Sequence, residues 1–141
     1  MTFRKILFAL FCAGTVFSVA AAAPADEPQA AAAAFWKALC AGDRTALERL
    51  AVGKPEKLAK VLADVAEIKK AADGDAEAAK TWQAFTEIRF TPSVITGDRA
   101  VVHALVTIEI GGRRTEEKLD SPVVLRRVGG KWRVDVDATD F

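Results

Sequence analysis

The sequence predicts an α+β domain in which N-terminal helices pack on one face of a curved, antiparallel, four-stranded meander. Apolar residues recur at the helical period of about 3.6 residues up to Phe85, and at the strand period of two from Ile88 onward. The strand region closes with Gly129-Gly130, a glycine pair between two alternating runs that indicates a β-hairpin. Helices followed by strands in this order are typical of α+β domains.

The first 22 residues have the composition of a cleaved signal peptide. Arg4 and Lys5 precede the apolar segment 6–19, and the following alanine run offers a cleavage site, which we place after Ala22. The apolar segment is shorter than the roughly 20 residues of a membrane-spanning helix. We therefore expect an exported bacterial protein, periplasmic or secreted, without stable membrane association after cleavage. Residues 23–30 are then a short polar lead-in, and residues 31–141 form a single domain.

The charge of the exported chain disfavours nucleic acid as a partner. Cleavage removes two basic residues and no acidic one, so 20 basic and 19 acidic residues become 18 and 19, a net charge of −1. Domains that bind nucleic acid through its phosphates carry a strongly basic patch, and a near-neutral chain of mixed signs gives no such signal.

Two helices are predicted before residue 53. Asp26 is a candidate cap, and Pro28 suits the first turn of a helix whose apolar positions continue to Leu39. Gly42 ends this helix as a left-handed residue, and Asp43 caps a second, short helix.

A third helix is predicted over residues 55–72. Its apolar stripe faces the strands, with a charged side toward solvent; the stripe consists of Leu58, Val61, Leu62, Val65 and Ile68. A further helical segment covers residues 76–85, with Trp82 in the core. It is either a separate helix or a kinked continuation of the third.

Four strands follow. The first places Ile88, Phe90 and Val94 on one face, and the second spans residues 99–110. The third begins at Arg113 and contains a kink at Ser121-Pro122. The last strand turns its apolar side toward the helices; this side consists of Trp132, Val134 and Val136.

Residues 35–47 contain an aromatic pair, a helix, Gly42-Asp43 and the start of a second helix. This arrangement resembles the opening of the nuclear transport factor two-like superfamily, whose fold is the cystatin-like α+β cone. Residues 124–135 are similar to its closing hairpin, and the chain also resembles small exported bacterial domains of unknown function in a lumazine-binding-like group. The resemblance implies helices across the concave side of the sheet and often a pocket inside the cone.

The enzymatic members of that superfamily, such as ketosteroid isomerase-like and polyketide cyclase-like proteins, place Asp, Tyr or His in the pocket. This chain has no tyrosine, which argues against a tyrosine-based oxyanion site. The sequence therefore offers no catalytic residue that we would name.

His103 and Trp36 are the two candidate ligand-binding residues. His103 is the one histidine of the chain and lies in the middle of the second strand, either as an acid–base or ligand-orienting group or as an ordinary half-exposed residue. Trp36 flanks the apolar stripe of the first helix, where it either lines a pocket mouth or an interface, or packs in the core.

Cys40 remains as the one cysteine after signal cleavage, so we expect it to be buried, with intermolecular pairing as the alternative. One histidine and one cysteine are too few ligands for a predicted metal site, and no cofactor is predicted. A nucleophilic pair of Cys40 and His103 is conceivable, but no spacing supports it.

Two classes of function remain open. The first is an exported, non-enzymatic binding or interaction module for an unknown small ligand or protein. The alternative is a small acid–base enzyme, similar to an isomerase, cyclase or hydrolase, that uses a pocket inside the cone. A homodimer formed through the sheet face is a further hypothesis about partners.

Overall fold

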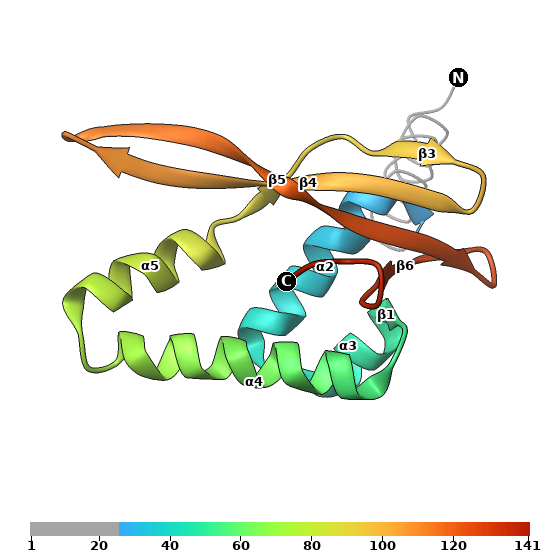
Figure 1. Ribbon diagram of the computed structural model, residues 1–141, viewed down its shortest axis with the longest axis horizontal. Helices are drawn as coiled ribbons and strands as arrows, with labels where there is room; N and C mark the ends of the chain where they lie inside the picture. The colour runs from blue at the N-terminus through green and yellow to red at the C-terminus, as the bar shows by residue number, and fades with distance from the viewer. Residues whose placement is uncertain (1–25) are drawn as a thin grey trace, which may run out of the picture.

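Helix α2 (Pro28–Ala41) lies directly against the sheet and forms the centre of the molecule (Figure 1). The computed structural model describes residues 26–141, so the predicted signal peptide and its cleavage site lie outside the described residues. Pro28 occupies the first turn of α2, and Gly42 ends the helix with a φ of 68°, both as predicted. Asp26 is not the cap that we expected, because its carboxylate pairs with the ammonium of Lys131 instead.

Helix α3 (Arg44–Leu50) begins at the predicted cap, where the side chain of Asp43 accepts a hydrogen bond from the backbone N–H of Ala46 at 3.1 Å. Gly53 follows with a φ of 126°, and a Cβ at this position would lie 2.7 Å from Cγ2 of Val136. Only glycine adopts this backbone without strain while approaching the neighbouring strand so closely.

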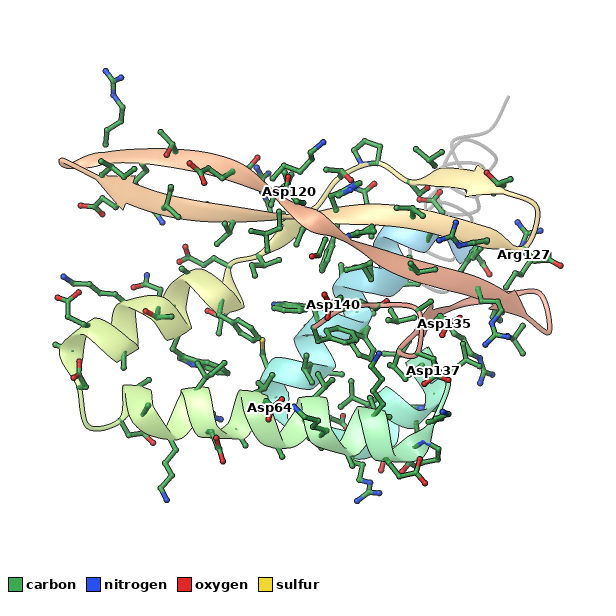
Figure 2. All side chains as sticks on the ribbon, viewed as in Figure 1. Asp64, Asp120, Arg127, Asp135, Asp137 and Asp140 are labelled. Atoms are coloured by element: carbon green, nitrogen blue, oxygen red, sulfur yellow. The ribbon has the colours of Figure 1, made fainter. Side chains whose placement is uncertain are left out.

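Helix α4 (Pro55–Ala72) has the predicted bounds. The prediction that its apolar stripe faces the strands is wrong, because the helix packs mainly against α2 and α5 and forms a third layer beyond α2 (Figure 1). Its start is tied to the end of the chain. The backbone N–H of Lys54 donates to the carboxylate of Asp137 at 3.1 Å, and Nζ of Lys57 donates to the carbonyl oxygen of Thr139 at 3.1 Å. Asp137 is labelled in Figure 2.

Helix α5 (Ala76–Thr86) is a separate helix, which answers the question that the sequence left open. Its cap Asp75 accepts hydrogen bonds from the backbone N–H groups of Glu77 at 2.7 Å and Ala78 at 3.1 Å. No residue of α5 is fully buried. The prediction that Trp82 belongs to the core is therefore corrected: this side chain is half-buried on a flank of the molecule.

The described residues form one six-stranded sheet in the order β1-β6-β5-β4-β2, with β3 also paired to β4. The α+β class is confirmed, but the sheet has two strands more than the predicted four. The strands are β1 (Ala51–Val52), β2 (Arg89–Phe90), β3 (Val94–Thr96), β4 (Arg99–Ile110), β5 (Arg113–Val128) and β6 (Lys131–Asp135). Strand β1 pairs parallel to β6 and was not predicted, because two residues are too short to show a period.

The first predicted strand is interrupted, and its residues do not share one face. Phe90 pairs with Ala104 and is buried, whereas Val94 pairs with Val101 and is 70% exposed. Pro92 lies between the two short strands and has no N–H with which to continue the ladder. The break therefore turns Val94 to the outer side of the sheet.

Strands β4 and β5 change register near the predicted kink. His103 pairs with Pro122 and Leu105 with Lys118, so two residues along β4 oppose four along β5. The extra residues of β5 form a bulge, which bends a strand and increases its twist. Beyond the bulge, residues 106–117 leave the body of the sheet as a two-stranded hairpin arm that passes over α5 (Figure 1).

The space between α2 and the concave side of the sheet is filled by side chains. Phe35 and Leu39 of α2 are each 1% exposed and belong to the same apolar cluster as the inner residues of β4, β5 and β6. The predicted inward side of the last strand is confirmed, since Trp132, Val134 and Val136 are 2%, 0% and 1% exposed. The fold therefore uses the inside of its cone as the hydrophobic core.

Candidate functional site

A groove runs between α2 and α5 on the flank of the molecule, with a volume of about 500 Å³. We call it the aromatic groove. It is lined by Ala33, Trp36, Lys37, Cys40, Ala41, Trp82, Thr86 and Ile88. One side of α2 is buried against the sheet, and the groove follows a less buried side of this helix.

The aromatic side chains of the groove are held rigidly. Nε1 of Trp36 donates a hydrogen bond to the carbonyl oxygen of Phe85 at 2.8 Å, and the centroids of the two rings are 4.5 Å apart. Trp82 stacks on Phe85 with an interplanar angle of 19°. Because the indole N–H of Trp36 is already bonded within the protein, the groove offers mainly apolar surface to a ligand.

Cys40 lies half-buried in the same groove, not fully buried as predicted. Burial raises the pKa of its thiol above the usual value, and the positive charge of Lys69 lowers it by a smaller amount. A thiol with a raised pKa is protonated at neutral pH and is a poor nucleophile. The groove therefore contains no activated cysteine.

A second hollow continues from the aromatic groove along α2, with a volume of about 400 Å³. The two hollows share Ala33 and Ile88. In the second hollow, Gln29 fixes the edge of the sheet, because its Nε2 donates to the carbonyl oxygen of Phe90 at 2.8 Å. An elongated ligand in the aromatic groove would meet this hollow next.

His103 lies on the other side of the sheet from α2. Its neighbours Val102 and Ala104 point into the core, so the alternation of a strand directs His103 outward. Its backbone N–H donates to Oγ1 of Thr91 at 2.9 Å, and its carbonyl oxygen accepts from the N–H of Thr91 at 2.9 Å. Its imidazole does not line the aromatic groove, so the fold separates Trp36 from His103 and Cys40 from His103.

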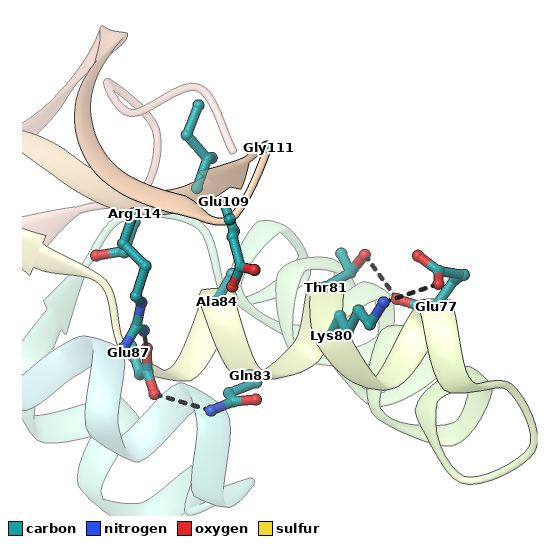
Figure 3. Close-up of a pocket in the computed structure, with 12 residues that line it drawn as sticks. Glu77, Lys80, Thr81, Gln83, Ala84, Glu87, Glu109, Gly111 and Arg114 are labelled. Carbon is teal, nitrogen blue, oxygen red and sulfur yellow. Dashed lines mark hydrogen bonds and ion pairs between the residues drawn. The ribbon is translucent and has the colours of Figure 1, made fainter.

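A larger cleft of about 610 Å³ separates α5 from the hairpin arm (Figure 3). Its charged side chains are mostly paired with one another: Lys80 with Glu77 at 3.0 Å, and Arg114 with Glu87 at 3.0 Å. The pKa of Lys80 is raised, first by its hydrogen bond to Glu77. Exposed pairs of this kind contribute little stability, and they leave few free groups for a ligand. We therefore favour the smaller, apolar groove as the functional site.

Within residues 26–141, no cluster of three or more His, Cys, Asp or Glu side chains is arranged to hold a metal ion. No helix of the same residues is both long enough and apolar enough to cross a membrane.

Three solved structures resemble this chain in fold. A SEC-C motif containing protein from Rhodopseudomonas palustris has a TM-score of 0.45 and 18% identity, over 83% of this chain and 81% of that one. A structure described as a putative NTF2-like transpeptidase from Campylobacter jejuni has a TM-score of 0.40 and 20% identity, over 72% of this chain and 90% of that one. An NTF2-like protein with a cystatin-like fold from Novosphingobium aromaticivorans has a TM-score of 0.39 and 18% identity, over 87% of this chain and 82% of that one.

Two of the three are described as NTF2-like, the superfamily that residues 35–47 resemble. At these identities and TM-scores the likeness concerns the fold and assigns no activity. No protein-family model and no curated protein matches the sequence.

The sequence pattern indicates Trp36 as a candidate but not its aromatic and aliphatic partners in the groove. Trp82 was assigned to the core because it continues the apolar side of its helix. Ile88 was assigned to a strand, although it directly precedes β2. No position of α5 is fully buried. This is a property of the tertiary packing, which the apolar spacing of the helix does not reveal.

Proposed function

We propose that this chain is an exported, non-enzymatic binding module that holds a small apolar ligand in the aromatic groove. The observation that carries the proposal is the half-buried pair Trp36 and Trp82, which face an open groove although the inside of the cone is full. Contiguous apolar surface that a monomer leaves exposed is a common mark of a binding site.

The chemistry of the groove favours binding over catalysis. Its lining contains one thiol, one threonine hydroxyl and one lysine, and no pair of groups suited to exchange protons with a substrate. The acid–base alternative rests on either His103 or a buried carboxylate that faces an enclosed pocket, and no carboxylate is fully buried among residues 26–141. An outward-facing His103 on the far side of the sheet gives that alternative no support.

Export rests on the N-terminal sequence alone. The basic residues Arg4 and Lys5, the apolar segment 6–19 and the alanine run before Pro24 are the three parts of a secretory signal. The matching experiment is to express the full chain in a bacterium, fractionate the cells and weigh the exported protein. A chain that begins at Ala23 in the periplasm or medium supports export; an uncut chain in the cytoplasm contradicts it.

Ligand binding is tested with Nile red, a neutral apolar dye whose fluorescence increases in apolar surroundings. Ala33 is exposed on α2 and lines both hollows, so Ala33→Gln fills the groove without removing a core contact. We expect wild-type protein to bind the dye saturably and Ala33→Gln to weaken binding by about tenfold or more, a loss equivalent to roughly 1.4 kcal/mol.

Ala59→Gln is the matched control, because Ala59 is also an exposed alanine on a helix but lies on α4, outside the groove. Equal loss in both variants, or no saturable binding by wild-type protein, would contradict the proposal. Native mass spectrometry of the exported protein then identifies a co-purifying molecule by its mass.

A further inference from the structure

Three arginines lie in one row across the outer face of the sheet. Arg99 of β4 pairs with Arg126 of β5, and Arg126 pairs with Arg133 of β6. Residues directly opposite one another in antiparallel strands have their side chains on the same face. The row begins at the edge strand β3, where Thr96 pairs with Arg99. We call Arg99, Arg126 and Arg133 the arginine row.

This arrangement is unfavourable in the absence of a negative partner, because like charges directly opposite across strands repel. The described residues provide the row with one ion pair, in which Nε of Arg126 lies 3.4 Å from Oδ2 of Asp135. The other carboxylate oxygen of Asp135 is occupied, since it accepts the backbone N–H groups of Asp137 and Ala138. The three guanidinium groups are thus compensated by a single ion pair with a long N–O distance.

Arg133 has a donor that the described residues leave unpaired. Its Nε is buried and forms no hydrogen bond with any described residue. A buried donor without a partner costs more free energy than a hydrogen bond normally gains, so native proteins rarely keep one without a reason. Because this Nε is covered by protein atoms, a ligand would bind at the terminal nitrogens of the half-buried Arg133 side chain instead.

The row adjoins a hollow of about 250 Å³ on the same outer face. Arg99 and Arg126 line it together with Thr96, whose hydroxyl can also donate a hydrogen bond. Asp98 and Asp135 line it as well and balance the charges of Arg99 and Arg126. The excess positive charge of the row therefore comes from Arg133, which does not line the hollow. Figure 2 labels Asp135 at the end of β6, on the side of the molecule opposite the hairpin arm. The hollow is therefore separate from the aromatic groove, with which it shares no residue.

We infer that the arginine row is a binding site for an oxyanion, the phosphate or carboxylate group of a small ligand. Guanidinium groups present planar, paired donors that match the oxygens of these groups, and several of them can share one anion. The bound anion offsets the repulsion within the row and accepts hydrogen bonds from donors that the protein leaves without partners. This site does not depend on the ligand of the aromatic groove.

The experiment follows the side-chain Nε–Hε signals of the arginines by NMR while inorganic phosphate, and separately acetate, replaces chloride at constant ionic strength. We expect saturable shifts of the Arg99, Arg126 and Arg133 signals, with phosphate or acetate. The tighter of the two anions identifies the group as phosphate or carboxylate. Absence of saturation with both anions overturns the inference.

Arg126→Gln removes the centre of the row, and we expect it to weaken the binding of the anion by about tenfold or more. Arg113→Gln makes the same charge change at the exposed tip of the hairpin arm and should alter the affinity less than about twofold. Equal weakening in both variants would show attraction to overall charge, which overturns the inference.

Arg99→Gln repeats the test without touching the Arg126–Asp135 ion pair, so the test does not depend on Arg126→Gln folding normally. If Arg99→Gln binds the anion as tightly as the wild-type protein does, the inference that the arginines share one site is overturned. Nile red binding, measured in parallel, stays unchanged in these variants if the two sites are separate, so the failure of one proposal is distinguishable from the failure of the other.

Discussion

The hydroxyl oxygen of Thr139 accepts a hydrogen bond from the backbone N–H of Val124 at 3.1 Å. Thr139 is 1% exposed and lies in the turn after β6, where its hydroxyl also donates to the carbonyl oxygen of Asp135 at 2.8 Å. The pairing of β6 with β5 extends to Leu125, which lies opposite Val134, and ends there. The side chain of Thr139 thus satisfies a sheet N–H at the point where the neighbouring strand leaves.

Replacing Thr139 with valine keeps the shape of the side chain and removes the hydroxyl. The N–H of Val124 then loses its partner in a buried place, so we expect the free energy of unfolding to fall by about 1–3 kcal/mol. Urea denaturation followed by circular dichroism measures the change. Thr115→Val, on the exposed hairpin arm, is the control and should change the value by less than about 0.5 kcal/mol. Equal changes in the two variants would contradict the role of Thr139.

Replacing Asp75 with alanine removes the two hydrogen bonds that cap α5. We expect a loss of about 1 kcal/mol, concentrated in α5, because no side chain of this helix is fully buried. Hydrogen exchange followed by NMR should show faster exchange in α5 than in α2. Asp73→Ala removes the same charge two residues earlier, where no side-chain cap is formed, and should leave exchange in α5 nearly unchanged. Uniform acceleration across the whole chain would refute a local effect.

The thiol of Cys40 should titrate at a higher pH in the folded protein than in the unfolded chain. Burial raises the pKa of this thiol, and Lys69 only partly opposes the shift. Because the pKa of the Cys40 thiol is higher in the folded than in the unfolded chain, its contribution to stability is fully present below the pKa of the unfolded chain. This contribution is lost as the pH rises through the pKa of the folded protein. The rate of reaction with a disulfide reagent, measured against pH, should therefore rise later in native protein than in denaturant.

Cys40→Ala gives the background for that measurement, including any reaction at Cys12. A native profile that rises at or below the usual thiol pKa of about 8.5 would contradict the prediction.

Local patterns were sufficient for most elements. Gly42 and Asp43 mark the boundary between α2 and α3, and the Gly129-Gly130 turn closes the last hairpin as predicted. These features depend on φ angles and on hydrogen bonds between residues close in the sequence, so their signals are complete within a few residues. The inward side of β6 was readable for the same reason, since alternation is a local property.

The sequence by itself determined the helix boundary at Gly42-Asp43, the hairpin turns and the α+β class, because each follows from the preferences of neighbouring residues. Only the tertiary structure decided that β1 joins β6, that Trp36 meets Trp82, and that Arg99, Arg126 and Arg133 form one row. These residues are far apart along the chain, and their meeting depends on strand register and helix packing. Register is set by the whole sheet at once, so no short stretch of sequence encodes it.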